Sequence, residues 1–341
     1  MEDLIKESII ASEEEFYNKD FYFSYSSLNK LMWNPAVFYQ MYVLGLKEES
    51  TSPSLIAGKV IHALLLNKEV FDEMFIISPS KLPSENTKLV VDRVFAHYKE
   101  LSANGDSRTE LKDYSDAILD VLVDINLHQS LKTDSQRLDK IISEDTISYW
   151  SFLKQKGNKE LIDQQLYDYC IQASDIIKQN PEINNIMGLN VSEFDNIEVF
   201  NEIELSKKLD NYSFGLKGII DNLVINHDEK KIYINDLKTT SKDLKDFPES
   251  VEYYSYWMQS TIYLILVFFK YEELLKQGYN ISFNFVVIDK TFMTYCFSVS
   301  EQTQQIWFDR FTNEILLAAN YHYTNKKYEL PYKFCTKQVI L

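Results

Sequence analysis

The chain has 341 residues, of which 45% are hydrophobic and 25% are charged. A chain this apolar can bury a sizeable core, so the composition excludes a mainly disordered protein. The formal net charge of −16 excludes a general nucleic-acid coat protein, which needs positive charge to displace counterions. It leaves open an enzyme with one local basic channel, because charges are screened beyond about 8–10 Å in physiological salt.

Cysteine usage indicates a reducing compartment. Cys170, Cys296 and Cys335 lie far apart and form no CxxC pair, so a zinc site is unsupported and we expect no iron–sulfur cluster. The acidic beginning of the sequence does not resemble a secretory signal. The longest apolar run, 262–269, falls well short of the roughly 20 residues that a membrane helix needs. We therefore expect a cytoplasmic protein without a membrane partner.

The first 84 residues are predicted to be mainly helical. Residues 25–44 form one helix, with Ser26 and Ser27 as N-cap candidates and a break near Asn34, since a helix rarely continues into a proline. Residues 54–66 form a second, mostly buried helix, and 75–77 form a short strand. Residues 85–190 show helical periodicity throughout and carry no chemical motif, so they are predicted to be a helical insertion.

The pattern then changes to alternation rich in Ile, Val, Tyr and Phe, which is typical of strands. Strands are predicted at 197–206, 212–226 and 231–238, and a second hairpin at 281–289 and 293–299. Helices are predicted at 251–276 and 301–320, followed by a tail to residue 341. The pattern predicts an α/β protein with a central mixed sheet flanked by helices. Because glycine and proline are few, we expect one interwoven domain, 1–341, whose sheet spans 195–300.

Two neighbouring strands carry the most informative residues. Asp236 and Lys238 share one strand face, with Leu237 on the other, because strand side chains alternate. Asp221, which follows Gly218 on the preceding strand, can come to lie beside Asp236 across the hairpin. Two carboxylates and an ammonium suit a hard divalent cation and a polarised water. A DxK triplet by itself is also common on the solvated face of a strand.

Three further features have ordinary interpretations when taken singly. His62 lies in an apolar helix, where a lone histidine is usually a hydrogen-bonded core residue. Gln259 and Tyr263 share a helix face at i and i+4, although Tyr263 reads most simply as core. Glu202 and Glu204 share a strand face, which is typical of a solvated strand.

Together and in this order, these pieces resemble the PD-(D/E)xK nuclease superfamily. The resemblance is to the RecB and lambda-exonuclease branch, and within it to the RecE (exonuclease VIII-like) phage recombination nucleases. It covers roughly 22–80 and 195–300. It rests on the opening Ser24-Tyr25-Ser26-Ser27-Leu28 and Pro35 to Tyr39, on Gly58/His62, Phe75 to Pro79 and Glu202 or Glu204, and on Gly218/Asp221, Asp236/Lys238 and Gln259/Tyr263.

The resemblance implies a restriction-endonuclease-like core that hydrolyses DNA phosphodiester bonds with Mg²⁺ or Mn²⁺. His62, Asp221 and Asp236 would be metal ligands, and the Leu237 carbonyl would complete the shell. Lys238 would activate or position the attacking water.

The family also implies residues that shape the site. Gln259 and Tyr263 would touch the DNA backbone. Glu202 is our first choice for the acid before GxxD, and Glu204 is the alternative. The implied activity is exonuclease action on double-stranded ends that produces single strands for recombination. A single-strand annealing partner and a ring-shaped homo-oligomer are implied in the same way.

Two features depart from the family pattern. The chain is acidic, and arginine is scarce, so contacts to DNA phosphates would fall to lysines such as Lys30 and Lys59. The tyrosines at 253, 254 and 256 suit stacking on unpaired bases, but packing beside the sheet is the simpler interpretation.

Two other classes of function remain. A silent nuclease-fold module that binds DNA or a partner protein, for example in phage–host defence, would be expected to lack an acid or the lysine, and all of these are present. An unrelated hydrolase with paired carboxylates, such as a glycosidase, would need neither metal nor lysine.

Overall fold

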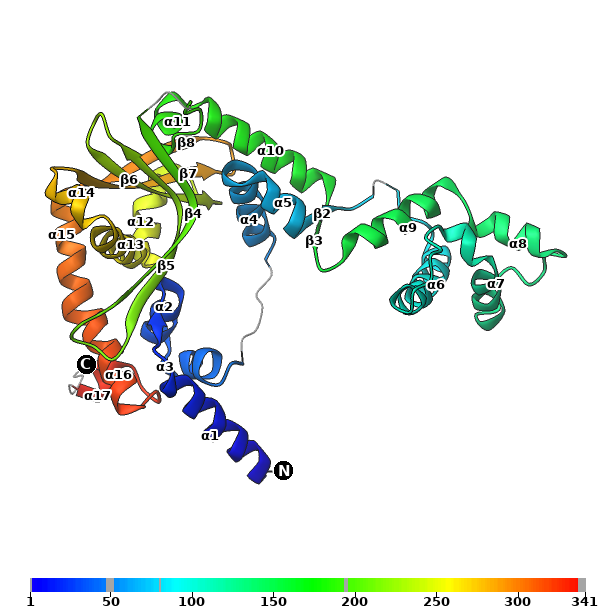
Figure 1. Cartoon of the computed structure of the whole chain (residues 1–341), viewed down its shortest axis with the longest axis horizontal. Coiled ribbons are helices and arrows are strands. Elements are labelled where there is room, and N and C mark those ends of the chain that lie inside the picture. Colours follow the sequence, from blue (N-terminus) through cyan, green and yellow to red (C-terminus); the bar gives the residue numbers. More distant parts are fainter. Residues whose placement is uncertain (1, 47–51, 80, 193–195, 337–341) are drawn as a thin grey trace. The chain divides into compact units, whose positions relative to one another are not determined.

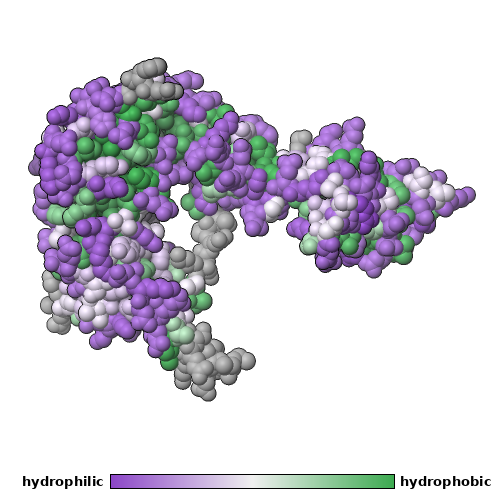
Figure 2. Space-filling model, viewed as in Figure 1, coloured by the Kyte–Doolittle hydropathy of each residue, from purple (hydrophilic) through white to green (hydrophobic). Residues whose placement is uncertain are grey.

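A computed structural model describes residues 2–46, 52–79, 81–192 and 196–336 (Figure 1). The chain forms two compact units. The sheet unit contains the residues up to Asn67 and from Gln172 onward, and the helical unit contains Lys68–Ile171. Hydrophilic residues dominate the face seen in Figure 2, in keeping with the large excess of Asp and Glu. No described helix is both long and apolar enough to cross a membrane.

The sheet unit is built around a mixed six-stranded sheet with the order β1-β5-β6-β7-β8, and β4 also pairs with β5. Its strands are β1 (Tyr22–Phe23), β4 (Ile197–Lys208), β5 (Gly215–Asn226), β6 (Lys231–Thr240), β7 (Asn280–Asp289) and β8 (Thr294–Val299). The pairs β4–β5, β5–β6 and β7–β8 are antiparallel, and β6–β7 and β1–β5 are parallel. The predicted α/β architecture and its two hairpins are confirmed.

The parallel pair β6–β7 requires a long crossover, and helices supply it. They are α12 (Phe247–Tyr253), α13 (Tyr256–Lys270) and α14 (Glu272–Lys276), preceded by a 3₁₀ turn at Leu244–Asp246. The single helix expected at 251–276 is therefore wrong. Ser255 takes a left-handed conformation with φ of 59° and ends the regular hydrogen bonding between α12 and α13.

The N-terminal helices follow the predicted pattern with one correction. They are α1 (Glu2–Asn18), α2 (Tyr25–Trp33), α3 (Pro35–Phe38), a π-helical turn (Tyr39–Val43) and α4 (Pro53–Leu66). The break at Pro35 is confirmed, and the Asn34 side chain caps α3 by accepting from two backbone N–H groups. The N-cap of α2 is Ser24 rather than Ser26 or Ser27, because Ser24 and Ser27 form a reciprocal capping box.

After β8 the helical segment expected at 301–320 is present and runs on to Asn325, and one further short helix lies in the predicted tail. The elements are α15 (Glu301–Arg310), a π-helical segment (Phe311–Leu316), α16 (Leu317–Asn325) and α17 (Tyr332–Thr336). Residues 337–341 of the predicted tail lie outside the described residues.

The helical unit has a core of its own around Trp150, whose indole donates to the Thr109 carbonyl. Its elements are α5 (Lys68–Met74), β2 (Phe75–Ile77), α6 (Glu85–Ala103), a 3₁₀ turn (Leu111–Tyr114), α7 (Ser115–Asp124), α8 (Asp134–Ile141), α9 (Glu144–Lys156) and β3 (Glu160–Ile162). Helix α10 (Gln164–Gln179) leads back to the sheet unit, where α11 (Pro181–Met187) follows. The expectation that 85–190 is helical throughout fails at β3. This segment pairs in parallel with β2, a distant partner that local periodicity cannot reveal.

A ladder of side-chain amides crosses the sheet; its central asparagines are buried, whereas Asn201 and Ser298 at its two ends are exposed. Asn222 donates to Asn201 (2.8 Å), Asn235 to Asn222 (2.7 Å) and Asn284 to Asn235 (2.9 Å), and Ser298 donates to Asn284 (2.7 Å). The ladder also reaches the helices on that face. Asn222 and Asn235 donate to the last carbonyls of α11, and Asn201 donates to the last carbonyl of α4. Because satisfied buried polar networks hold strands and helices in one arrangement, the ladder fixes α4 against the sheet.

We expect Asn235→Leu to lower the free energy of unfolding by about 3 kcal/mol. Leucine has a similar size but leaves three polar groups, on Asn222, Asn284 and Ile186, without their hydrogen-bond partner. Urea unfolding followed by tryptophan fluorescence measures this loss. Asn280→Leu, at an exposed position of β7, is the matched control and should change little. Equal unfolding midpoints for the two variants would show that the ladder does not stabilise the sheet.

Candidate active site

The predicted acids lie where β5 and β6 separate. The backbone ladder between these strands runs from Asn226–Lys231 only as far as Asn222–Asn235. The next two opposed residues are Asp221 and Asp236. The Asp221 carboxylate accepts the Leu237 N–H at 2.8 Å, so this side chain takes the place of a strand carbonyl at the fork. The fork therefore brings the two acids of the sequence motif together.

An irregularity in β4 lies opposite this fork. Glu202 has a φ of 52°, in the left-handed region, between the regular pairs Asn201–Asn222 and Ile203–Ile220. On β5, the buried core positions change from Leu216 and Ile220 to Leu223 and Ile225, so the alternation shifts by one residue here. Such irregularities commonly re-aim a side chain beside a functional site. This one lies directly across from Asp221.

Asp236 is buried without the usual partners of a carboxylate. It has no exposed surface, and neither oxygen makes a hydrogen bond of good geometry with the described residues. The Lys238 Nζ lies 2.6 Å from Oδ2 and supplies the neighbouring charge. Burial raises the pKa of Asp236 above that of an ordinary aspartate, against the lowering effect of Lys238. This carboxylate thus has room in its coordination for a further cation.

Lys238 begins a chain of hydrogen bonds that leads to α13 and back to β5. Its ammonium donates to Gln259 Oε1 at 3.0 Å, and Gln259 donates to the Tyr263 hydroxyl at 3.0 Å. Tyr263 donates to the Ile219 carbonyl at 2.6 Å. A Cβ at Gly218 would lie 2.6 Å from the Tyr263 ring, so only glycine allows this approach.

Burial by itself would lower the pKa of the Lys238 ammonium, but the attraction of Asp236 and Asp221 outweighs it and raises this pKa. The side chain is only 15% exposed. Lys238 is therefore held as a cation at a fixed place, which suits a group that orients a water or a phosphate oxygen.

His62 comes to the same fork from α4. Its Nε2 lies 3.0 Å from the Leu237 carbonyl oxygen, and its Nδ1 lies 3.8 Å from Asp221 Oδ2. A Cβ on Gly58, one turn earlier, would meet the Thr239 hydroxyl at 3.3 Å, so glycine permits the close packing of α4 on β6. The histidine and the backbone carbonyl named by the motif thus lie together.

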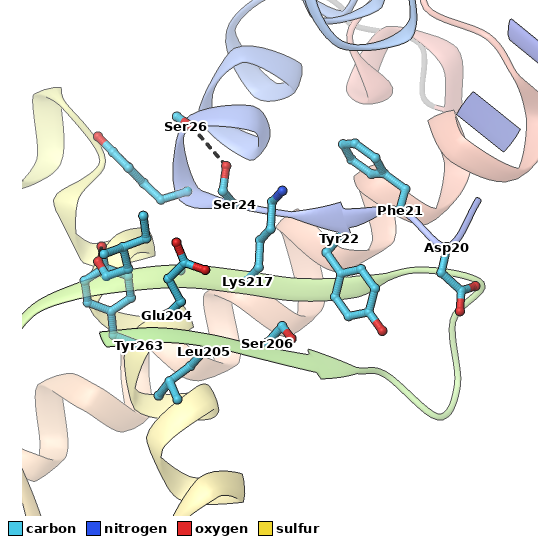
Figure 3. Close-up of a pocket in the computed structure, with 13 residues that line it drawn as sticks. Asp20, Phe21, Tyr22, Ser24, Ser26, Glu204, Leu205, Ser206, Lys217 and Tyr263 are labelled. Atoms are coloured by element: carbon cyan, nitrogen blue, oxygen red, sulfur yellow. Dashed lines mark hydrogen bonds between the residues drawn. The ribbon is translucent and has the colours of Figure 1, made fainter. Parts of the chain in front are cut away.

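The remaining predicted residues lie further out. Glu202 is exposed beside Asp221, whereas Glu204 pairs with Ile219 and lines a neighbouring cavity of about 720 Å³. Figure 3 shows Glu204 and Lys217 rising from β4 and β5 on the side of Ser24, with Tyr263 at one end. Lys59 is exposed on α4. Lys30 lies over the exposed ring of Trp33, 4.9 Å from its centre, rather than beside the acids.

Two aromatic residues belong to this site beyond those predicted for it. Lys238 lies over the ring of Tyr256, 4.7 Å from its centre. Tyr25, in the first turn of α2, has its ring 6.5 Å from that of Tyr256. The position of Tyr256, three before Gln259 and seven before Tyr263, was an available signal, because these spacings share one helix face.

The donor chemistry suits a divalent metal ion. Asp221 and Asp236 offer carboxylate oxygens and Leu237 offers a carbonyl, which are the ligand types of Mg²⁺ and Mn²⁺ sites. His62 adds an imidazole, a nitrogen ligand that is more typical of softer divalent metals. Within the described residues, no group of three or more His, Cys, Asp or Glu side chains is already gathered closely enough to hold a metal. The unpartnered oxygens of Asp236 are the feature that fits a cation best.

The fold and the site define an α/β protein of restriction-endonuclease-like architecture. The sequence model of the PD-(D/E)XK nuclease superfamily matches residues 22–305, and the chain belongs to this superfamily. Its members generally use divalent metal ions. A search of curated proteins found no match.

Among solved structures, the chain is similar to a candidate exonuclease from Eubacterium rectale, with 13% identity and a TM-score of 0.45. The similarity covers 94% of this chain and 89% of the other. At this level it carries no argument, and the family assignment rests on the sequence match.

We expect Tyr263→Phe to lower the free energy of unfolding by about 1–3 kcal/mol, because it leaves the Ile219 carbonyl and the Gln259 amide without their partner. Thermal and urea unfolding measure the effect. Tyr295→Phe, at an exposed position of β8, removes the same hydroxyl and should be neutral. If Tyr263→Phe is equally neutral, the hydroxyl does not hold the chain of hydrogen bonds together.

Proposed function

We propose that this protein is a metal-dependent DNA exonuclease of the RecE-like branch that degrades double-stranded ends. The observation that carries the proposal is the meeting of Asp221, Asp236 and Lys238 at the β5–β6 fork in a chain of the nuclease superfamily. The Ser24 to Leu28 opening and the Gln259/Tyr263 pair support the RecE-like assignment by sequence resemblance.

Each residue has a part in this proposal. Asp221, Asp236, His62 and the Leu237 carbonyl hold Mg²⁺ or Mn²⁺, which supplies charge stabilisation at the phosphate and lowers the pKa of a water. Lys238 holds the attacking water or a phosphate oxygen in place. Gln259 fixes the Lys238 ammonium, and Glu202 provides a further carboxylate at the edge of the site.

The wider setting follows from the same resemblance. We propose that residues 1–341 act as a single nuclease domain, in a bacterial or phage-infected cytoplasm, with the helical segment as an insertion. The single strands produced would serve recombination, with a single-strand annealing protein as partner and a homo-oligomeric ring as the working form.

The first test uses linear duplex DNA labelled at the 5′ or the 3′ end, with Mg²⁺ or EDTA. We expect metal-dependent shortening from one labelled end. Lys238→Ala should reduce the rate by about 100-fold or more, because it removes a fixed charge from the reacting phosphate. Lys245→Ala is the matched control, since Lys245 is exposed and pairs with Asp243. Folded protein that cleaves with neither Mg²⁺ nor Mn²⁺ would favour the silent binding module.

A second test addresses the metal without measuring cleavage. Titration calorimetry with Mn²⁺ should show binding by the wild type and a loss of at least about tenfold in affinity for Asp221→Asn, which keeps the shape but removes a charged ligand. Asp228→Asn, in the exposed β5–β6 turn, should bind as the wild type does. Equal affinities for the two variants would place the metal elsewhere.

A further inference from the structure

The break between α12 and α13 leaves aromatic side chains at the surface beside the candidate active site. Tyr253 is 78% exposed and Tyr254 is 44% exposed, whereas Trp257, three residues after Tyr254 in α13, is buried. Packing beside the sheet therefore explains Trp257 but not these two tyrosines. Two adjacent exposed rings at a fixed break in the chain require another explanation.

These rings form a line that begins at Lys238. Lys238 lies over Tyr256, and Tyr254 stacks on Tyr256 with ring centres 5.4 Å apart and planes at 28°. Tyr253 meets Tyr254 edge to face, at 4.9 Å and 90°. Lys242, after β6, lies 5.7 Å from the Tyr253 ring. The result is a line of three tyrosines with an ammonium group at each end, which we call the tyrosine step.

The step is held in place by contacts to α2. Tyr25 donates its hydroxyl proton to the Tyr254 carbonyl at 2.5 Å, and Asn29 donates to the same oxygen at 3.4 Å. Burial raises the pKa of Tyr25, so its hydroxyl stays protonated and able to donate. The left-handed Ser255 fixes the turn between the rings. Rings held in this way lose little entropy when they bind a flat ligand.

We propose that the tyrosine step stacks on an unpaired base of the DNA end that enters the site. An unpaired base offers a flat π-face to a ring, while the flanking ammonium groups match the charge of its phosphates. The base pairs of an intact duplex already stack on each other, so the step favours frayed or single-stranded ends. The proposal rests on the proposed nuclease function and names the form of DNA that the site takes first.

The test measures stacking without cleavage. A duplex with a two-nucleotide unpaired end carries 2-aminopurine in that end, and its fluorescence is followed in EDTA as protein is added. We expect quenching by the wild type. Tyr253→Ala/Tyr254→Ala should lose the quenching and bind about tenfold more weakly, whereas Tyr253→Phe/Tyr254→Phe should keep both, because the ring and not the hydroxyl stacks. Phe268→Ala removes a ring that is 52% exposed near the far end of α13, and this variant should behave as the wild type.

Quenching that persists in the alanine variant, or that is absent in the wild type, overturns the tyrosine step. Cleavage of the end-labelled duplex with Mg²⁺ is measured on the same proteins. If the wild type cleaves and the alanine variant quenches as strongly as the wild type, the tyrosine step is rejected and the nuclease function stands. If quenching requires the tyrosines but the protein does not cleave DNA, the tyrosine step stands and the nuclease function is rejected.

Discussion

The buried carboxylate of Asp236 is the constraint on which the candidate site depends. A charged group without exposed surface is costly unless partners compensate it, and the described residues provide one nearby cation and no well-formed hydrogen bond. The raised pKa of this carboxyl expresses that cost. Lys238, Gln259 and Tyr263 are joined by hydrogen bonds that hold the Lys238 ammonium beside Asp236. The oxygens of Asp236 remain without a hydrogen bond of good geometry from the described part of the chain. A site arranged in this way gains stability when a second cation arrives.

Neighbouring residues on β5 and β6 have different roles on the two faces of the sheet. Asn222 follows Asp221 and Asn235 precedes Asp236, so each acid of the fork is next in sequence to a rung of the amide ladder. The rungs point to the face of α11 and are fully bonded, which holds β5 and β6 together just before they separate. The ladder also reaches the end of α4 through Asn201, and α4 carries His62. Rigidity on one face therefore supports an under-bonded site at the fork.

The sequence was informative where the signal is local. Strand alternation placed Asp236 and Lys238 on one side, and helix periodicity placed Gln259 and Tyr263 together, because both rules act over a few residues. It was uninformative where the cause is distant or unusual. The amide ladder joins asparagines 21, 13 and 49 positions apart, and the β2–β3 pair joins segments on either side of several helices. At the break, Ser255 takes a left-handed conformation that usually favours glycine, so the sequence gives no sign of it.

The tyrosine step also bears on how an acidic protein could hold DNA. Each of the four arginines has a carboxylate partner: Arg93 has Asp124, Arg108 has Asp106, Arg137 has Asp134 and Arg310 has Glu252. Their charges are thus engaged within the protein, and phosphate contacts fall to lysines. Stacking does not require a positive surface, because every base has a π-face. Affinity that comes from rings should depend less on salt than affinity from counterion release. On our proposal, the net charge of −16 would repel duplex DNA in general, while the exposed rings at the α12–α13 break would accept an unpaired end. Selectivity for ends would then follow from the same excess of negative charge that at first argues against a DNA enzyme.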